Sequence, residues 1–389
     1  RVLRDVGVGA TNRPARALSG SSGMKGNNRI LIMAGGTGGH VYPALAVASE
    51  LRERGYRVEW VGTRRGLEHR VVPEAGFTLH YLAVRGVRGK GVSDRIMGLL
   101  LLAVASLQAL WLVLRTWPAC VVGMGGYVAG PAGVAAWLLR RPLLIHEQNA
   151  VAGTTNRMLA PLASKVVAGF YGAFSNGTDV SVLGNPVRAD LIAAAESADY
   201  DYDGERAMRL LVLGGSLGAR PINEVRPGVV RRLLRGGKVH ATEVLHQAGE
   251  QHATVVIEQY GDLVSETVRV VPFIEDMAHA YLWSDLVICR AGALTVSELA
   301  VTGRPSILVP LPHAIDDHQT ANARSLANAC GAILLRQSDM TEDAILIALR
   351  SYVQFPGRLR TMAEAAHKAA LPLATKQVAD EVEALVHAA

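Results

Sequence analysis

Aromatic residues and cysteines are scarce in this sequence of 389 residues. Phe, Trp and Tyr together supply 5% of it, whereas hydrophobic residues supply 50%, so aliphatic side chains must build the core. The cysteines at positions 120, 289 and 330 lack metal-ligand spacing, which argues against a zinc site and indicates a reducing compartment. The length favours two domains.

An apolar secretory signal is also missing. Residues 1–28 are rich in Gly, Ser, Arg and Asn and show no apolar periodicity, which predicts a disordered extension. Met24 is a candidate start of the native chain, with an upstream or engineered extension before it. We therefore leave residues 1–28 out of the fold prediction.

Negative charge is scarce in the first half of the chain. Residues 1–29 carry a net charge of +5, residues 30–187 of +7 and residues 188–389 of −6. A basic half favours an anionic partner, either phosphate groups or an anionic membrane surface. The alternative is merely uneven surface charge. Nothing in the pattern favours a nucleic-acid partner.

Near-continuous apolar strands alternate with helical stretches along the rest of the chain. This alternation predicts α/β architecture with parallel sheets that are covered on both faces. The pattern restarts after "GNPVR" (184–188), so we expect two doubly wound, Rossmann-like domains, at residues 29–187 and 188–389, with a cleft between them. The expected strands are 29–34, 57–62, 119–124, 142–146, 209–214, 243–247, 268–273, 285–289 and 306–310.

A glycine-rich loop with one histidine follows the first strand, in "MAGGTGGHVYPALAVA" (33–48). Glycines let the backbone approach a ligand closely, and the helix that follows offers free amides to an anion. Val41 occupies the place of the third glycine in a dinucleotide fingerprint, and no Walker lysine follows. The loop therefore predicts an anion site of another kind, with a purely structural tight turn as the alternative.

Two further glycine loops follow strands, in "GMGGYVAGP" (123–131) and "GGSLGA" (214–219). The third loop also matches the nucleophile elbow of serine hydrolases, with Ser216 as nucleophile and an Asp and a His downstream. Asp276 with His279, or Asp316 with His318, would complete that triad. The hydrolase hypothesis explains neither of the first two loops.

The stretch "RAGALTVSELAV" (290–301) places small residues before a helix, where its amides would face an anion. Glu298 lies about one turn into this helix, and a carboxylate there can accept hydrogen bonds from the two hydroxyls of a ribose. A favourable charge near a helix start is the alternative. The polar segment "DDHQTANA" (316–323) either borders the cleft or caps a helix through Asp316 or Asp317.

These motifs, together with "HEQN" (146–149) and "FIEDM" (273–277), occur in an order that resembles the MurG family over residues 29–389. The resemblance implies a GT-B fold, in which the last helix can cross back to the N-terminal domain. It implies an inverting, metal- and cofactor-independent transfer of N-acetylglucosamine from UDP-GlcNAc to the C4 hydroxyl of lipid I, which gives lipid II. It also implies a peripheral location on the cytoplasmic face of the bacterial inner membrane, with other cell-wall or division proteins as further partners.

The resemblance also assigns residues to each substrate. Arg188 would stabilise the charge of the leaving group, and Glu298 would bind the ribose. The other donor-binding residues would be Thr37, Gly38, Gly39, Asn149, Ser216, Ile274, Ala293, Leu294, Thr295, Val296, Ser297 and Gln319. Those near the acceptor or its pyrophosphate would be Gly35, Gly36, Gly125, Gly126 and Tyr127.

Such a transfer needs a base for the acceptor hydroxyl. His40 is the candidate base, because an ordinary imidazole pKa of about 6.5 lies in the useful range. The alternative is that His40 only positions the acceptor. Glu147 is a second carboxylate to consider, and we interpret it as structural.

Residues 96–114 form a strongly apolar run in which only Ser106 and Gln108 are polar. As a helix the run would extend about 28 Å, enough to span a bilayer. A spanning helix would put two strands of one sheet on opposite sides of the membrane, which argues against spanning. A fully buried crossover helix is another alternative. Basic residues and tryptophans beside the run favour a helix that packs on the sheet and inserts its outer face into the membrane.

Two alternatives at the level of function stay open beside the hydrolase. Non-hydrolysing UDP-GlcNAc epimerases resemble the same two-domain fold, so the fold alone does not exclude an isomerase. A nucleotide-sugar-binding regulator without activity is the other. The apolar run and the basic loop before it argue against an epimerase, and the presence of His40, Arg188 and Glu298 argues against a regulator.

Overall fold

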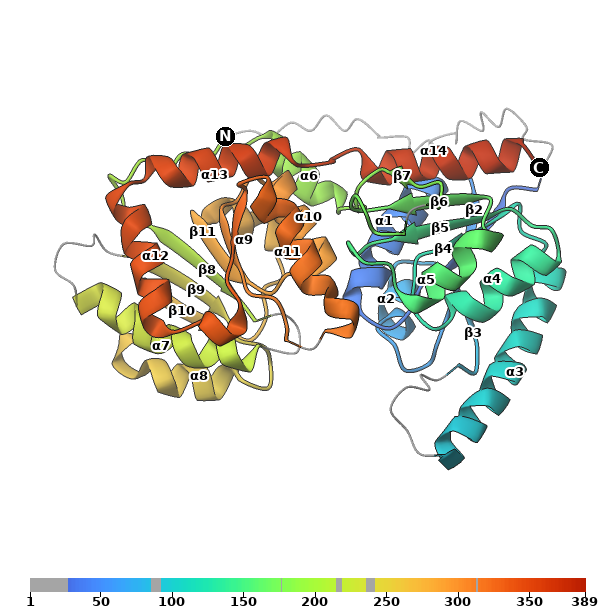
Figure 1. Cartoon of the computed structure of the whole chain (residues 1–389), viewed down its shortest axis with the longest axis horizontal. Coiled ribbons are helices and arrows are strands. Elements are labelled where there is room, and N and C mark those ends of the chain that lie inside the picture. The colour runs from blue at the N-terminus through green and yellow to red at the C-terminus, as the bar shows by residue number, and fades with distance from the viewer. Residues whose placement is uncertain (1–26, 85–91, 176, 215–218, 236–241, 313) are drawn as a thin grey trace, which may run out of the picture.

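The computed structural model describes residues 27–84, 92–175, 177–214, 219–235, 242–312 and 314–389. These residues form two α/β domains that lie side by side, each built on a parallel sheet (Figure 1). The N-terminal sheet has the strand order β3-β2-β1-β4-β5-β6-β7, and the C-terminal sheet has the order β10-β9-β8-β11-β12-β13. Both orders are those of doubly wound sheets, in which ligands bind at the carboxyl ends of the strands.

The N-terminal sheet comprises β1 (Arg29–Met33), β2 (Arg57–Gly62), β3 (Thr78–Tyr81), β4 (Cys120–Gly123), β5 (Leu143–Glu147), β6 (Lys165–Ala168) and β7 (Ser181–Val182). Its helices are α1 (Gly38–Glu53), α2 (Glu68–Glu74), α3 (Val92–Thr116), α4 (Ala129–Leu138) and α5 (Thr154–Leu159). The C-terminal sheet comprises β8 (Arg209–Leu213), β9 (Glu243–Gln247), β10 (Val268–Val271), β11 (Leu286–Cys289), β12 (Ser306–Leu308) and β13 (Ala332–Leu334). The helices from α6 on are α6 (Ala189–Glu196), α7 (Arg220–Arg235), α8 (Ala253–Tyr260), α9 (Met277–Trp283), α10 (Ala293–Val301), α11 (His318–Asn328), α12 (Glu342–Gln354), α13 (Gly357–Lys368) and α14 (Ala374–His387).

The central strands β4 and β11 are apolar throughout, and β1 and β8 are apolar after their first residue, because both faces of each sheet are covered. In β1, Ile30 and Ile32 join the core on one face, whereas Leu31 and Met33 join a separate core on the other. The same alternation divides β8 between two cores in the C-terminal domain. This arrangement explains why the strands appear in the sequence as continuous apolar runs.

The last helix, α14, returns to the N-terminal domain. It continues the line of α13 across both domains, along the upper edge of Figure 1. Val378 and Val382 of α14 pack in the core formed by β1 and α1. Arg54, at the end of α1, forms ion pairs of 2.7 Å with Asp380 and 2.6 Å with Glu383. The first strand and the last helix thus belong to one domain.

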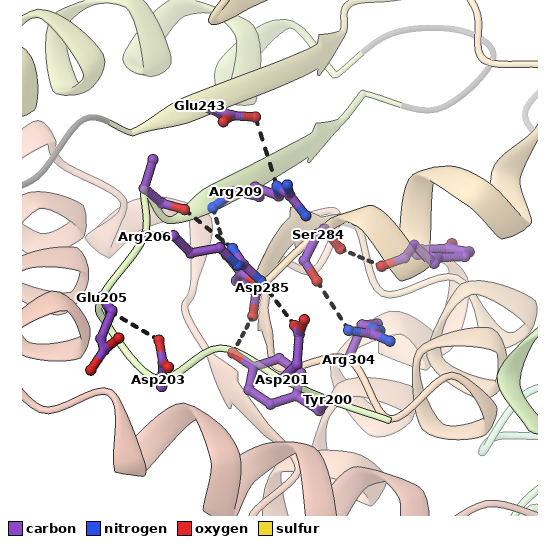
Figure 2. Close-up of polar contacts among 12 residues, drawn as sticks. Tyr200, Asp201, Asp203, Glu205, Arg206, Arg209, Glu243, Ser284, Asp285 and Arg304 are labelled. Carbon is purple, nitrogen blue, oxygen red and sulfur yellow. Dashed lines mark hydrogen bonds and ion pairs between the residues drawn. The ribbon is translucent and has the colours of Figure 1, made fainter. Parts of the chain in front are cut away.

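The segment between α6 and β8 is anchored by a buried carboxylate at the amino ends of β8 and β11 (Figure 2). Asp285 accepts two hydrogen bonds from the guanidinium of Arg206, at 2.7 and 2.8 Å, and a third from the backbone N–H of Arg209. The hydroxyl of Tyr200 donates to the backbone oxygen of Asp285 at 3.0 Å. This cluster lies at the opposite end of the sheet from the loops that follow the strands, so we assign it to stability.

Helix α3 is amphipathic in the structure rather than enclosed. Ala105, Ala109, Leu112 and Val113 pack against the N-terminal sheet. The opposite side exposes Met97, Leu100, Val104, Leu107, Trp111 and Leu114. Leu102 is exposed as well, although the helical spacing places it on the packed side, nearer the start of the helix. The alternative of a fully buried crossover helix is therefore wrong, because no described residue covers this side of the helix. Within the described part of the chain, no helix combines the length and the apolar character that crossing a membrane requires.

Candidate active site

The first glycine loop is held in place by the buried carboxylate of Glu68, at the start of α2. Oε2 of Glu68 accepts the backbone N–H of Gly36 at 2.9 Å. Its Oε1 accepts both the N–H and the hydroxyl of Thr63, each at 2.8 Å. A Cβ atom on Gly35 would lie 2.8 Å from Oε1, so a glycine is needed for this close approach. The sequence analysis missed Glu68, although its position shortly after a strand end, beside Thr63, is a usable signal.

The second glycine loop packs directly on the first. Gly125 and Gly126 both have positive φ angles, +94° and +86°, which favour glycine. A Cβ atom on Gly125 would lie 2.6 Å from Nδ1 of His40, and one on Gly126 would lie 2.4 Å from the backbone oxygen of Gly35. The loops after β1 and β4 thus interlock around His40, and these two positions leave no room for a larger residue.

His40 lies in the first turn of α1 and is partly buried. Its Nδ1 contacts Oε1 of Gln148 at 3.0 Å. Gln148 follows β5 in the "HEQN" segment, so three neighbouring strand ends supply the surroundings of this imidazole. A partly exposed imidazole between two glycine loops can exchange a proton with a bound hydroxyl.

Glu147 has a structural role, as the sequence interpretation expected. This buried carboxylate accepts hydrogen bonds from the backbone N–H groups of Asn149 and Gly153, at 2.9 and 3.0 Å. The side-chain amides of Asn149 and Asn156 donate to it at 3.1 and 2.8 Å. Four donors satisfy the carboxylate, which stabilises the turn between β5 and α5.

The two domains meet through amide side chains at the carboxyl ends of their strands. Oδ1 of Asn322, in α11, accepts the N–H of Ala150 at 2.7 Å, and its Nδ2 donates to Asn149 at 3.2 Å. Asn185 donates to the backbone oxygen of Gln148 and to the hydroxyl of Ser297, both at 3.0 Å. These bonds bring α10 and α11 next to the "HEQN" segment.

Glu298 and Tyr281 form the polar centre of the C-terminal side. The Tyr281 hydroxyl donates to Oε2 of Glu298 at 3.0 Å. Burial raises the pKa of Glu298 to about 7, while the Tyr281 hydrogen bond and the positive charge of Arg188 act in the opposite direction. Glu298 is thus poised to change its charge near neutral pH. Helix α10 begins at Ala293, after the N-cap Gly292, so its first amides point away from the strands.

Comparisons with known proteins identify the family. The sequence model of the glycosyltransferase family 28 N-terminal domain matches residues 30–168, and that of the family 28 C-terminal domain matches residues 209–378. A UDP-N-acetylglucosamine–N-acetylmuramyl-(pentapeptide) pyrophosphoryl-undecaprenol N-acetylglucosamine transferase of Pseudomonas putida (strain W619) is 50% identical, over 90% of this chain and 96% of its own. The crystal structure of MurG from Acinetobacter baumannii is 39% identical, covers 92% of this chain and 99% of its own, and has a TM-score of 0.78.

The chain belongs to the MurG family. The predicted resemblance and the GT-B architecture are therefore confirmed. UDP-GlcNAc 2-epimerase from Neisseria meningitidis, bound to UDP-GlcNAc, is only 14% identical at a TM-score of 0.64, a likeness that concerns the fold alone. Identity of 50% to a transferase against 14% to an epimerase decides between these two alternatives.

Membership of the MurG family also leaves the hydrolase hypothesis without support. Ser216 lies outside the described residues. Asp276 accepts the backbone N–H of His279 at 2.9 Å and thereby caps α9, which is not the imidazole contact of a triad. Asp316 pairs with Arg157 of α5 at 2.9 Å.

The structure brings most of the residues predicted for a MurG-type site to these strand ends. Thr37, Gly38 and Gly39 open α1, and Tyr127 is exposed beside the second loop. Arg188 is the N-cap of α6, and its charge acts on Glu298. Val296 is different, because its side chain lies in the hydrophobic core and its N–H donates to Gly292.

Four other predicted residues have partners of their own. The Gln319 side chain accepts the N–H of Leu311 at 2.9 Å. Ser297 is bonded to Asn185, and Ile274 packs partly against the core of the C-terminal domain. Asn149 reaches Asn322 across the domain boundary. Whether these residues also touch the donor stays a prediction.

Proposed function

We propose that this chain catalyses the lipid II-forming step of peptidoglycan synthesis. It transfers N-acetylglucosamine from UDP-GlcNAc to the C4 hydroxyl of the N-acetylmuramoyl residue of lipid I. The observation that carries this function is the identity of 50% to a transferase of this name over 90% of the chain. The interlocked glycine loops around His40, and the Glu298 site in the other domain, supply the two halves of a suitable site.

The transfer is a single displacement that inverts the anomeric carbon. The acceptor C4 oxygen attacks C1 of the donor sugar on the face opposite UDP. The bond between C1 and the phosphate oxygen breaks, and its electron pair leaves with UDP. His40 takes the hydroxyl proton as the new bond forms, and positive charge or backbone amides stabilise the phosphate that departs.

In this proposal the donor lies on the C-terminal domain. Glu298 accepts hydrogen bonds from the ribose hydroxyls, and Arg188 stabilises the diphosphate charge. The backbone N–H groups at Ala293, Leu294 and Thr295 approach the diphosphate or the sugar, because α10 begins there. Ser216, Ile274 and Gln319 would contact the diphosphate, the uracil and the sugar.

The acceptor lies on the N-terminal domain, where the glycine loops face its pyrophosphate. The exposed apolar side of α3 would insert into the membrane surface beside it, with Arg115 stacked on Trp111 at 5.0 Å and Arg141 on Trp117 at 5.1 Å. Basic residues around an apolar surface favour an anionic bilayer. We therefore place the enzyme at the cytoplasmic face of the plasma membrane, where other cell-wall or division proteins can join it.

The test is transfer of radiolabelled GlcNAc to a short-chain lipid I analogue in the presence of EDTA. The wild type should form labelled lipid II analogue, since no step needs a metal. His40→Ala should lower turnover by about 10²- to 10⁴-fold with near-normal UDP-GlcNAc binding, which is the range of general-base contributions. Epimerised or unchanged UDP-GlcNAc with the wild type would refute the transferase function.

A further inference from the structure

His40 is the first member of a hydrogen-bonded chain that continues into the protein interior. Its Nδ1 lies 3.0 Å from Oε1 of Gln148. Nε2 of Gln148 lies 3.0 Å from the backbone oxygen of Met124 and 3.1 Å from Nδ1 of His146. Nε2 of His146 lies 2.9 Å from the backbone oxygen of Gly184. Gln148 and His146 are both buried, so water does not compete for these bonds.

The donors and acceptors of this chain can be assigned from its inner end. A backbone carbonyl only accepts, so Nε2 of His146 must carry a hydrogen. Burial lowers the pKa of His146 and outweighs the opposing effects of the Gly184 carbonyl and of Glu147, so His146 is neutral. A neutral imidazole has one N–H, which leaves Nδ1 of His146 as an acceptor.

The orientation of the Gln148 amide follows from these two acceptors. Its NH₂ group faces Met124 oxygen and His146 Nδ1, and it donates one hydrogen to each. The reversed amide would place an oxygen against both acceptors and lose both bonds. Oε1 therefore faces His40, and an amide oxygen can only accept. Nδ1 of His40 must donate, which leaves the hydrogen off Nε2 in the neutral ring.

We propose that Gln148, held by His146, is a positioning residue that fixes neutral His40 in the tautomer with its hydrogen on Nδ1. The lone pair is then on Nε2, the atom that takes the proton of the acceptor hydroxyl. This inference rests on the proposed transferase function for its purpose, but the tautomer itself is a property of the unliganded protein.

Two further observations support this role. Among the described residues, no group forms a hydrogen bond with Nε2 of His40, so that atom is left for a substrate. The ring is also confined from the side, since a Cβ atom on Gly125 would lie 2.6 Å from Nδ1 and 2.9 Å from Cε1. Gln148 thus sets the tautomer while Gly125 provides the room for the ring to lie there.

The tautomer can be read directly by long-range ¹H–¹⁵N correlation spectra of the full chain labelled in its histidine rings. The spectra are recorded without substrate near pH 8.5, about two units above the ordinary imidazole pKa, and His40→Ala assigns the signals. We expect a protonated Nδ1 and an unprotonated Nε2 for His40. A neutral His40 with its hydrogen on Nε2 would overturn the proposal.

Two variants separate positioning from packing. Gln148→Met and Gln148→Glu both remove the NH₂ that serves Met124 and His146, but only the glutamate keeps an oxygen that accepts from His40. Gln148→Met should give mixed tautomers and lower kcat by about 10- to 100-fold, less than the 10²- to 10⁴-fold expected when the general base itself is lost. Gln148→Glu should keep the Nδ1–H tautomer and stay within about tenfold of the wild-type kcat.

Other outcomes count against the proposal in different ways. If His40 keeps its hydrogen on Nδ1 in Gln148→Met, then Gln148 does not set the tautomer. If both variants lose the same activity while the His40 tautomer is unchanged, then Gln148 only supports packing. UDP-GlcNAc binding, measured by calorimetry, confirms that each variant folds. The wild-type spectrum decides the tautomer even for a variant that fails to fold. Absence of GlcNAc transfer by the wild type would refute the proposed function and leave the tautomer result intact.

Discussion

Replacing Glu68 by Gln tests whether a single buried carboxylate holds the first glycine loop. The carboxylate accepts three hydrogen bonds, one from Gly36 and two from Thr63. A glutamine whose oxygen keeps both Thr63 bonds places its NH₂ against the N–H of Gly36, donor against donor. The Gly36 bond is then lost, and the N–H is left without a partner.

The size of the effect follows from the geometry. A hydrogen bond to a charged group contributes about 1.5–3 kcal/mol, so the loss of one should lower the free energy of unfolding by about 2 kcal/mol. For a domain of this size, the melting temperature should fall by about 4–8 °C. A shift of about 1 Å in the loop that faces the acceptor should lower kcat/KM for lipid I by about 10²-fold.

The assay compares Glu68→Gln with Glu74→Gln, a change of the same charge at an exposed position of the same helix. Calorimetry gives the melting temperature, and radiolabel transfer gives kcat/KM for the acceptor. UDP-GlcNAc affinity should change less than kcat/KM for the acceptor in Glu68→Gln, because most of the proposed donor-binding residues lie in the other domain, and it should be unchanged in Glu74→Gln. If Glu68→Gln melts and turns over like Glu74→Gln, the reasoning about the loop is wrong.

Three further predictions concern the donor, the membrane and the last helix. UDP-GlcNAc affinity should fall by up to about tenfold per pH unit as the pH drops below 7. The raised pKa of Glu298 leaves its carboxyl group protonated there, whereas the ribose hydroxyls bind the carboxylate better. Titration calorimetry at several pH values measures this affinity, and Glu298→Gln should remove most of its pH dependence. Leu107 on α3 is 68% exposed, and Leu107→Asp should weaken binding to anionic vesicles in a sedimentation assay. Ile347 in the other domain is 69% exposed, and the control variant Ile347→Asp should bind these vesicles like the wild type. Arg54→Ala should lower the free energy of unfolding by about 1–2 kcal/mol, because it removes the ion pairs with α14. Equal denaturation curves for the variant and the wild type at low salt would contradict this.

The sequence predicted the central strands well because they are buried on both faces. All nine runs that it marked are strands, with ends that differ by at most two residues. The strands it missed are β3, β6, β7 and β13, which have two to four residues each. All four lie at the edge of a sheet or next to it, where pairing with a neighbouring strand creates them.

The sequence predicted the site only as far as motifs follow strand ends. The first two glycine loops follow neighbouring strands of one parallel sheet, so topology alone brings them near each other, whereas Glu298 follows a strand of the other sheet. Contacts between distant segments were beyond its reach. Nothing in the spacing shows that Glu68 holds the loop at Gly36, or that α14 packs on α1. Likewise, only the structure shows which side chains of α3 pack on the domain and which are exposed.

The "HEQN" segment shows how one strand end serves two purposes through its period of two. His146 and Gln148 form the hydrogen-bonded chain that ends at His40. Glu147 and Asn149 alternate with them; Glu147 binds the turn that follows, and Asn149 reaches Asn322 in the other domain. Successive side chains of an extended segment point to opposite sides, so proton chemistry and domain contact can share four residues. An insertion or deletion of one residue here would exchange the two sets, so we expect a change of length to disturb this segment more than a single substitution does.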